Sequence, residues 1–393
     1  MSEHLGKLLK GLEAPAVLEL GGAADSQPLD YGRVTQQLDA VAAIAMPQLV
    51  EIVAEGMAEW PEGAASHVVH KQVEDKLLIM YVAPTNAELP TRLLAAGTTA
   101  VGGMYFGDQT GDRGDWPMTR ANATVGLVTP DQVHRGRYRD RLSALGRIEG
   151  HIKELARPED VPYVLSCFYD QVLRNEAYMQ LLSRQYLRAQ DRPAFLAAHA
   201  AHLADVTTVS AGFPSVASSW YAIQRQEDPS LAPLSEIYSS TPLKEMLQAC
   251  NATVRIWDEL GDWRMDTGAD PSKGVFVINP LNEYHPAFVG RYCKLAFLQN
   301  PKKVAALQYA FANFHGRPNS PDIAAERQTH TAFILETFRT HIRDYMAAVE
   351  ANLPPMLHDR YRPFLTHCRR VLKIGYINSV GDIAMMRPSQ PTA

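Results

Sequence analysis

Two groups of aspartates have the spacing that gathers carboxylates on one side of a helix. The first consists of Asp108 and Asp112 in MYFGDQTGDRGD, with Asp115 further on. Residues i and i+4 share a helix face, so Asp108 and Asp112 can aim two carboxylates at one point. We expect this segment to end a helix, where the helix dipole disfavours anions unless a cation compensates. The pattern indicates a cation site, and the alternative is a solvated helix end.

The second group lies in NATVRIWDELGDWRMDTG. Asp258, Asp262 and Asp266 fall at positions i, i+4 and i+8, which places them on one stripe of a helix. Carboxylates at this spacing repel one another by a few tenths of a kcal/mol per pair. Neighbouring Trp257 and Trp263 indicate a partly apolar setting rather than open solvent. A bound cation would relieve the repulsion, and the alternative is again a solvated face.

Two facing carboxylate helices suit Mg²⁺, a hard ion that shares its octahedral shell among a few carboxylates, waters and substrate phosphates. A diphosphate ester fits such a site, because its ionisation requires charge neutralisation on the leaving diphosphate. Basic side chains near the motifs would assist as donors to the diphosphate, and we select Arg113, Arg255 and Lys273 for this role. The alternative for each is a surface ion pair.

The two motifs resemble, in order, separation and helical setting, the paired DxxxD motifs of class I isoprenoid (terpene) synthases. The nearest forms are those of the squalene/phytoene synthase and tetraprenyl-β-curcumene synthase branches. The residues that carry the resemblance are DQTGDR from Asp108 to Arg113, then NATVRIWDELGDWRMD from Asn251 to Asp266, followed by Lys273-Gly274 and Asn279-Pro280. Gly107 departs from a strict DDxxD motif, and KGVFVINP only approximates the stretch that follows the second motif in head-to-head synthases.

This resemblance implies an all-α bundle in which two aspartate-rich helices face each other across a cavity and bind a Mg²⁺ cluster. Asp108 and Asp112 would form the first metal-binding pair, and Asp258, Asp262 and Asp266 the second. The implied activity is ionisation of a prenyl diphosphate, release of diphosphate, and cyclisation or elimination to a terpene. Head-to-head condensation of two prenyl diphosphates is the alternative within the family.

Several aromatic side chains near the motifs would either line an apolar pocket and stabilise a carbocation, or pack in the core. They are Tyr105, Phe106, Phe168, Tyr169, Phe213, Trp257 and Tyr284.

The residues alone also allow two other classes of protein. A helical di-metal oxygenase also projects carboxylates into a bundle, but its Glu-x-x-His pairs are absent, and His202 with Asp205 is the nearest approach. A non-catalytic helical scaffold would leave both aspartate groups solvated. GxSxG, GxxxxGK[ST], HExxH and a strand-linked GxGxxG are missing, so the common hydrolase, nucleotide-binding and zinc-protease classes lack their motifs.

The elements that must position these residues are predicted to be helices, because apolar residues recur at helical spacing and alternating strand patterns are almost absent. One long helix should begin near Asp160 or Pro162. Pro47 predicts a kink or break, as do Gly212 and Pro214. Residues 267–287 indicate a long functional loop. The other predicted helices cover residues 33–60, 66–83, 88–114, 193–224, 235–266, 288–314, 321–351 and 357–378.

We therefore predict an all-α protein, a single large helical bundle with a central apolar cavity. Residues 1–30 form an N-terminal extension, residues 31–385 one isoprenoid synthase-like domain, and residues 386–393 a frayed tail. Within the 393 residues, 46% are hydrophobic and 21% charged, which is typical of a folded protein.

Charge and cysteine content limit the kinds of partner and metal site that we expect for this chain. With 43 acidic against 38 basic residues and a net charge of -5, the chain offers no broad positive surface for nucleic acid. Its four cysteines form no CxxC pair, which indicates reduced, mostly buried thiols rather than disulfides or structural zinc. We find neither a signal peptide nor a transmembrane stretch and expect a cytoplasmic protein. The expected partner is the prenyl diphosphate, and the assembly we consider is a homodimer.

Overall fold

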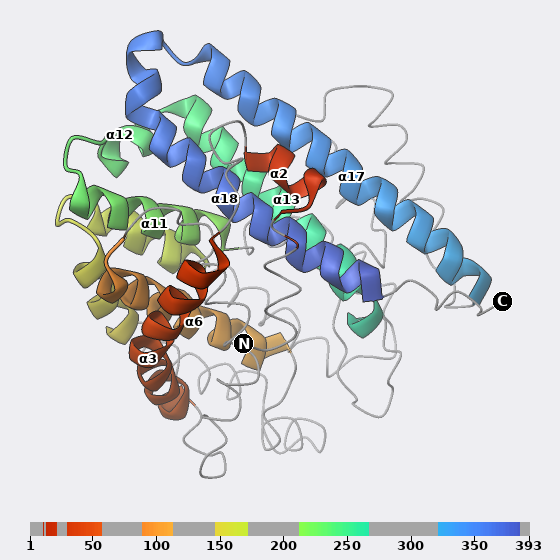
Figure 1. Ribbon diagram of the computed structural model, residues 1–393, viewed down its shortest axis with the longest axis horizontal. Coiled ribbons are helices and arrows are strands. Elements are labelled where there is room, and N and C mark those ends of the chain that lie inside the picture. The colour runs from red at the N-terminus through yellow and green to blue at the C-terminus, as the bar shows by residue number, and fades with distance from the viewer. Residues whose placement is uncertain are drawn as a thin grey trace, which may run out of the picture.

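The computed structural model describes residues 11, 13–21, 30–56, 89–112, 146–171, 212–266 and 321–385. Every regular element in these ranges is a helix, which confirms the all-α prediction (Figure 1). Two helical stretches cover residues 146–155 and 161–171. The others are α2 (Pro15–Gly21), α3 (Tyr31–Gly56), α6 (Thr91–Asp112), α11 (Phe213–Glu227), α12 (Leu234–Ser239), α13 (Thr241–Asp266), α17 (Pro321–Asn352) and α18 (Pro355–Met385).

Three predicted helices match the structure closely in position, because their apolar periodicity is long and regular. They are residues 88–114, 321–351 and 357–378, which correspond to α6, α17 and α18. Helix α3 continues through Pro47 without ending there. The predicted helices at 66–83 and 288–314, the predicted loop at 267–287 and the tail at 386–393 lie outside the described residues.

The single helix predicted over residues 235–266 is wrong, because the structure divides this segment at Ser240 into α12 and α13. Pro242 explains the division. A proline ring clashes with the carbonyl four residues earlier, here that of Tyr238, so one helix does not run through this position. Thr241 is the first residue of α13.

The predicted interruption at Gly212 and Pro214 is confirmed as the start of α11. Gly212 caps the helix with φ 68°, in the left-handed region that favours glycine. A Cβ there would lie 2.8 Å from Nε2 of Gln171. The backbone N–H of Phe213 donates to Oδ1 of Asn251 at 3.3 Å, which satisfies one of the open donors at the helix start.

Helices α17 and α18 are antiparallel neighbours joined by a short turn (Figure 1). Helix α13 packs against both of them, and the short helix α2 lies on the same pair. Helix α11 contacts α18, α13 and α6, and α3 packs along α6. One connected set of buried apolar side chains includes residues from all of these helices.

Helix α6 is buried over ten consecutive residues of its length. Residues 94–103 are all buried, so the helix is covered on every side over this length. Most of these residues are Ala, Gly and Thr, whose small side chains allow neighbouring helices to approach closely. The two threonines are satisfied, with Thr98 donating to the Leu94 carbonyl at 2.8 Å and Thr99 to Gln48 at 3.0 Å.

Candidate functional site

The first aspartate pair occupies the last two turns of α6. The helix ends at Asp112, so Asp108 and Asp112 lie on a helix four residues apart, as predicted. Their side chains are outside the described part of the structure. The backbone places the pair in the last two turns of α6, beyond residues 94–103, which are buried in the core.

The second aspartate group occupies the C-terminal half of α13. Asn251, Ala252 and Thr253 are buried, as are Ile256 and Trp257, and the stripe begins directly after them. Asp258 is solvent-exposed, with 57% of its side-chain surface accessible. Asp262 and Asp266 follow on the same helix, which ends at Asp266, and their side chains are outside the described set.

Arg255 belongs to the same helix as the second aspartate group, α13, and contacts its first member. Its Nη1 lies 3.3 Å from Oδ2 of Asp258, an ion pair between positions i and i+3 of α13. The arginine side chain is largely buried, with 14% exposed, so its charge is held beside the exposed carboxylate. The other two predicted diphosphate donors, Arg113 and Lys273, lie outside the described residues.

The two motif-bearing helices are connected through α11. This helix packs against both α6 and α13. In Figure 1, α6 and α13 both run toward the lower right, so their C-terminal ends lie on the same side in this view. The residues that connect them include Phe213 at the start of α11, whose backbone N–H is bound by Asn251 of α13.

The predicted Mg²⁺ site rests on five carboxylates, of which only Asp258 has a described side chain. Among the described side chains, no group of three or more metal-ligating residues comes together. The metal site therefore stays a prediction. Its donor set suits Mg²⁺, because carboxylate oxygens are the hard ligands that this ion prefers.

Three of the aromatic residues near the motifs lie in the core. Phe168, Phe213 and Trp257 are fully buried members of the hydrophobic cluster, and Trp257 packs edge-to-face on Tyr376 with ring centroids 5.2 Å apart. Tyr169 is exposed and its hydroxyl donates to Glu149. Of the two roles predicted for these residues, packing accounts for the three buried rings. Tyr284 and the side chains of Tyr105 and Phe106 lie outside the described set.

A buried ion pair at Asp160 was not anticipated from the sequence, which marked this residue only as a helix start. Its carboxylate accepts from the backbone N–H of Leu234 at 2.9 Å and from Arg225, and both charged side chains are buried. Burial raises the pKa of the Asp160 carboxyl, against the lowering effects of Leu234 N–H and Arg225. The sequence signal for this pair was Arg225, an arginine that falls among the buried positions of α11 and so requires a buried acidic partner. The Asp160 carboxylate thus ties the start of helix 161–171 to Arg225 of α11 and to the first residue of α12, Leu234.

A second unanticipated cluster joins Cys167, Ser218 and Tyr238. The Tyr238 hydroxyl lies 2.8 Å from Sγ of Cys167 and 2.7 Å from Oγ of Ser218. Burial raises the pKa of the Cys167 thiol, which therefore stays protonated and is a poor nucleophile at neutral pH. Together with Cys250 and Cys368, it is a free thiol, which confirms the prediction for these three cysteines.

Comparison with protein-family models, with curated proteins and with solved structures finds no match to this chain. Within the described ranges, none of the helices combines the length and the apolar character needed to span a membrane.

Proposed function

We propose that this protein is a Mg²⁺-dependent terpene synthase of the class I type, which ionises a prenyl diphosphate, releases diphosphate, and cyclises the product or eliminates a proton from it. One observation carries the proposal. Each aspartate motif occupies the last turns of a helix that has a buried stretch earlier in its length, residues 94–103 in α6 and residues 249–253 with Ile256 and Trp257 in α13, and α11 packs against both helices. Carboxylates at the ends of such helices would stand at the border between apolar and polar surroundings.

The proposal assigns a role to each acidic residue. Asp108 and Asp112 of α6 would hold Mg²⁺ from one side, and Asp258, Asp262 and Asp266 of α13 from the other. When bound, Mg²⁺ would neutralise the charge that develops on the leaving diphosphate. The helix C-termini carry the negative ends of the helix dipoles, so the carboxylates gain from a cation at this place.

The basic residues would complete the diphosphate site. Arg255 already pairs with Asp258, and its guanidinium stays charged at any physiological pH. A planar donor of this kind binds phosphate oxygens in two parallel hydrogen bonds. Arg113 follows the first motif directly and Lys273 follows the second, so the same role is proposed for both.

The activity is tested by incubating the purified protein with ten-, fifteen- and twenty-carbon prenyl diphosphates, with and without Mg²⁺. Diphosphate release is followed, and extracted products are identified by mass spectrometry. We expect Mg²⁺-dependent release and a hydrocarbon or alcohol with the carbon number of the substrate. A product of doubled carbon number would establish head-to-head condensation instead. Absence of release at every chain length would contradict the proposal.

The role of the second motif is tested with Asp258→Asn, which keeps the shape of the side chain but removes its charge. We expect at least about a tenfold loss of Mg²⁺-dependent release. Mutation of a residue that only supports a metal ligand already lowers metal affinity or activity by about this factor. Asp359→Asn is the matched control, because Asp359 is also exposed and pairs at i,i+3 spacing with an arginine, Arg362, at 3.2 Å. Equal activity in the two variants would remove Asp258 from the site.

A further inference from the structure

Helix α2 is a short segment whose structure depends on docking. It packs against α18 and α17, and its Val17 and Leu20 are buried in the common core. A helix of seven residues is too short to be stable alone in water, so α2 exists as a helix because of this contact. Whatever loosens the contact releases the whole segment.

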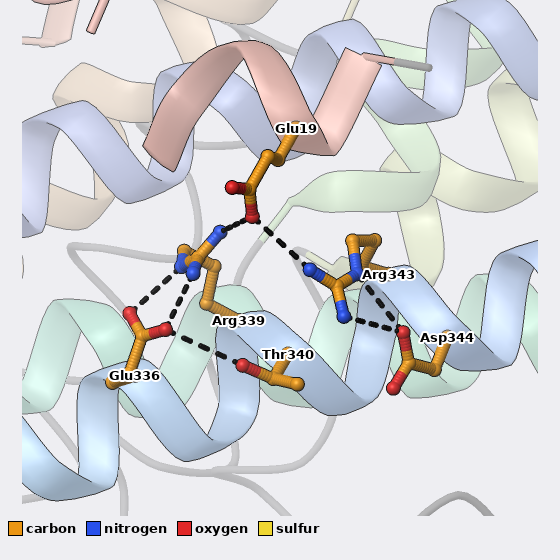
Figure 2. Close-up of polar contacts among 6 residues, drawn as sticks. All are labelled: Glu19, Glu336, Arg339, Thr340, Arg343 and Asp344. Carbon is orange, nitrogen blue, oxygen red and sulfur yellow. Dashed lines mark hydrogen bonds and ion pairs between the residues drawn. The ribbon is translucent and has the colours of Figure 1, made fainter. Parts of the chain in front are cut away.

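The polar part of the contact centres on one carboxylate (Figure 2). Oε2 of Glu19 accepts from Nη1 of Arg339 at 2.7 Å and from Nη1 of Arg343 at 3.0 Å. The two arginines lie one turn apart on α17, and each has a second acidic partner on its own helix, Glu336 for Arg339 and Asp344 for Arg343. Glu19 is the member of this cluster that comes from α2.

Arg339 extends the contact into the protein interior. Its side chain is 8% exposed, so the guanidinium is placed where neighbouring charges are poorly screened. Tyr376 of α18 is buried in the same apolar cluster as Val17 and Leu20 of α2. The apolar side of α2, which packs on α18, and Tyr376 therefore belong to one packed core.

Tyr376 and its neighbour Gly375 lie in the contact between α18 and the second aspartate helix, α13. The Tyr376 ring packs edge-to-face on Trp257, with an interplanar angle of 71°. A Cβ at Gly375 would lie 3.0 Å from Cγ2 of Val254 and 3.7 Å from the Trp257 ring. Close-packed interiors transmit displacement, because they hold few voids that could absorb it. Asp258 is the residue that follows Trp257.

We propose that α2 is a docking strap that positions the C-terminal half of α13, with Glu19 and Leu20 as positioning residues that act through α18, whose Tyr376 packs on Trp257. When the strap is docked, α18 is held against Val254 and Trp257, and the first carboxylate of the second motif is fixed. When it is undocked, the segment around Asp258 opens more often. The consequence for catalysis rests on the proposed function, whereas the positional effect does not.

The test is hydrogen exchange followed by mass spectrometry on the full chain, without Mg²⁺ or substrate. Glu19→Ala removes the ionic contact, and Leu20→Ala removes the apolar one. We expect both to speed exchange in residues 13–21 and in residues 251–258. For Glu19→Ala the increase in residues 251–258 should be about threefold, within the range for loss of a partly exposed ion pair, and for Leu20→Ala it should be at least as large because a buried side chain is lost. Residues 213–227 of α11 should exchange as in the wild type.

Two variants serve as controls. Asp344→Ala removes an acidic partner of Arg343 that belongs to α17 rather than α2, so it should leave residues 251–258 unchanged. Leu20→Met keeps the buried volume and should restore wild-type exchange. The strap proposal would be overturned if exchange became faster in α2 but stayed at the wild-type rate in residues 251–258. A uniform acceleration that includes α11, or an α2 that stays protected in both alanine variants, would overturn it too. A failed turnover assay alone would count only against the proposed activity.

Discussion

His367 is a histidine that the fold keeps neutral. Its side chain is buried among Trp220 and Tyr221, and Nε2 contacts the side-chain amide oxygen of Gln224. Burial lowers the pKa of His367 to about 3, and the positive charge of Arg370 adds to this. An unfolded histidine titrates near ~6.5, so below that pH the unfolded chain binds a proton here that the folded chain does not.

The sign of the resulting pH effect follows from this difference. The contribution of His367 to stability is intact above the unfolded pKa and declines as the pH falls toward about 3. Between pH 7.5 and pH 4.5, the free energy of unfolding should fall by about 2 to 3 kcal/mol more in the wild type than in His367→Gln. Urea unfolding at the two pH values measures this.

His358 provides the comparison, because it is a partly exposed histidine on the same helix, α18. Its variant His358→Gln controls for the loss of a histidine at a partly exposed position of this helix. Equal acid sensitivity in His367→Gln and the wild type would show that His367 titrates normally in the folded protein.

Single residues also show what sequence reasoning can and cannot predict. The spacing of Asp108 and Asp112, and of Asp258 and Asp262, predicts their place on helices, because helical periodicity is a local property. The pairing of Glu19 with Arg339 and Arg343 is different. It joins positions more than 300 residues apart, and no local pattern in an exposed carboxylate indicates its partner.

At the scale of elements, the contact between α13 and α18 depends on the absence of a side chain at Gly375. We expect Gly375→Ala to destabilise the protein by about 1 to 3 kcal/mol, because the added Cβ would lie 3.0 Å from Cγ2 of Val254 and the packing around that side chain would have to shift. Thermal or urea unfolding measures the loss.

Val254→Ala provides the compensating change, since it removes both methyl groups that the new Cβ would meet. The double variant Gly375→Ala with Val254→Ala should be more stable than the sum of the single effects predicts. A stabilising effect of Gly375→Ala alone, as expected for an unconstrained helical glycine, would contradict this account of the contact.

Helix boundaries were predictable to the extent that local signals set them. Long amphipathic patterns located α6, α17 and α18, and Gly212 with Pro214 located the start of α11. The division between α12 and α13 was missed because apolar periodicity continues across Ser240, although Pro242 interrupts the backbone. Conversely, Pro47 lies within α3, where tertiary packing retains the helix.

At the scale of the molecule, the core unites helices from both ends of the chain. Buried residues of α2, near the N-terminus, and of α18, near the C-terminus, belong to one connected cluster. Helix α11 contacts the helices that carry the two aspartate groups. That intermediate position was not predictable from sequence, because helical periodicity identifies a buried face without identifying the helix that covers it.

The most direct test of the central claim is the rate of diphosphate release against Mg²⁺ concentration for the wild type, Asp108→Asn, Asp258→Asn and the double variant. If the two motifs hold one metal site, each single change should lower the rate at least about tenfold, and the double change should add little, because residues that act as a unit are not additive. Release without Mg²⁺, wild-type rates in both single variants, or effects that simply multiply would contradict a shared site.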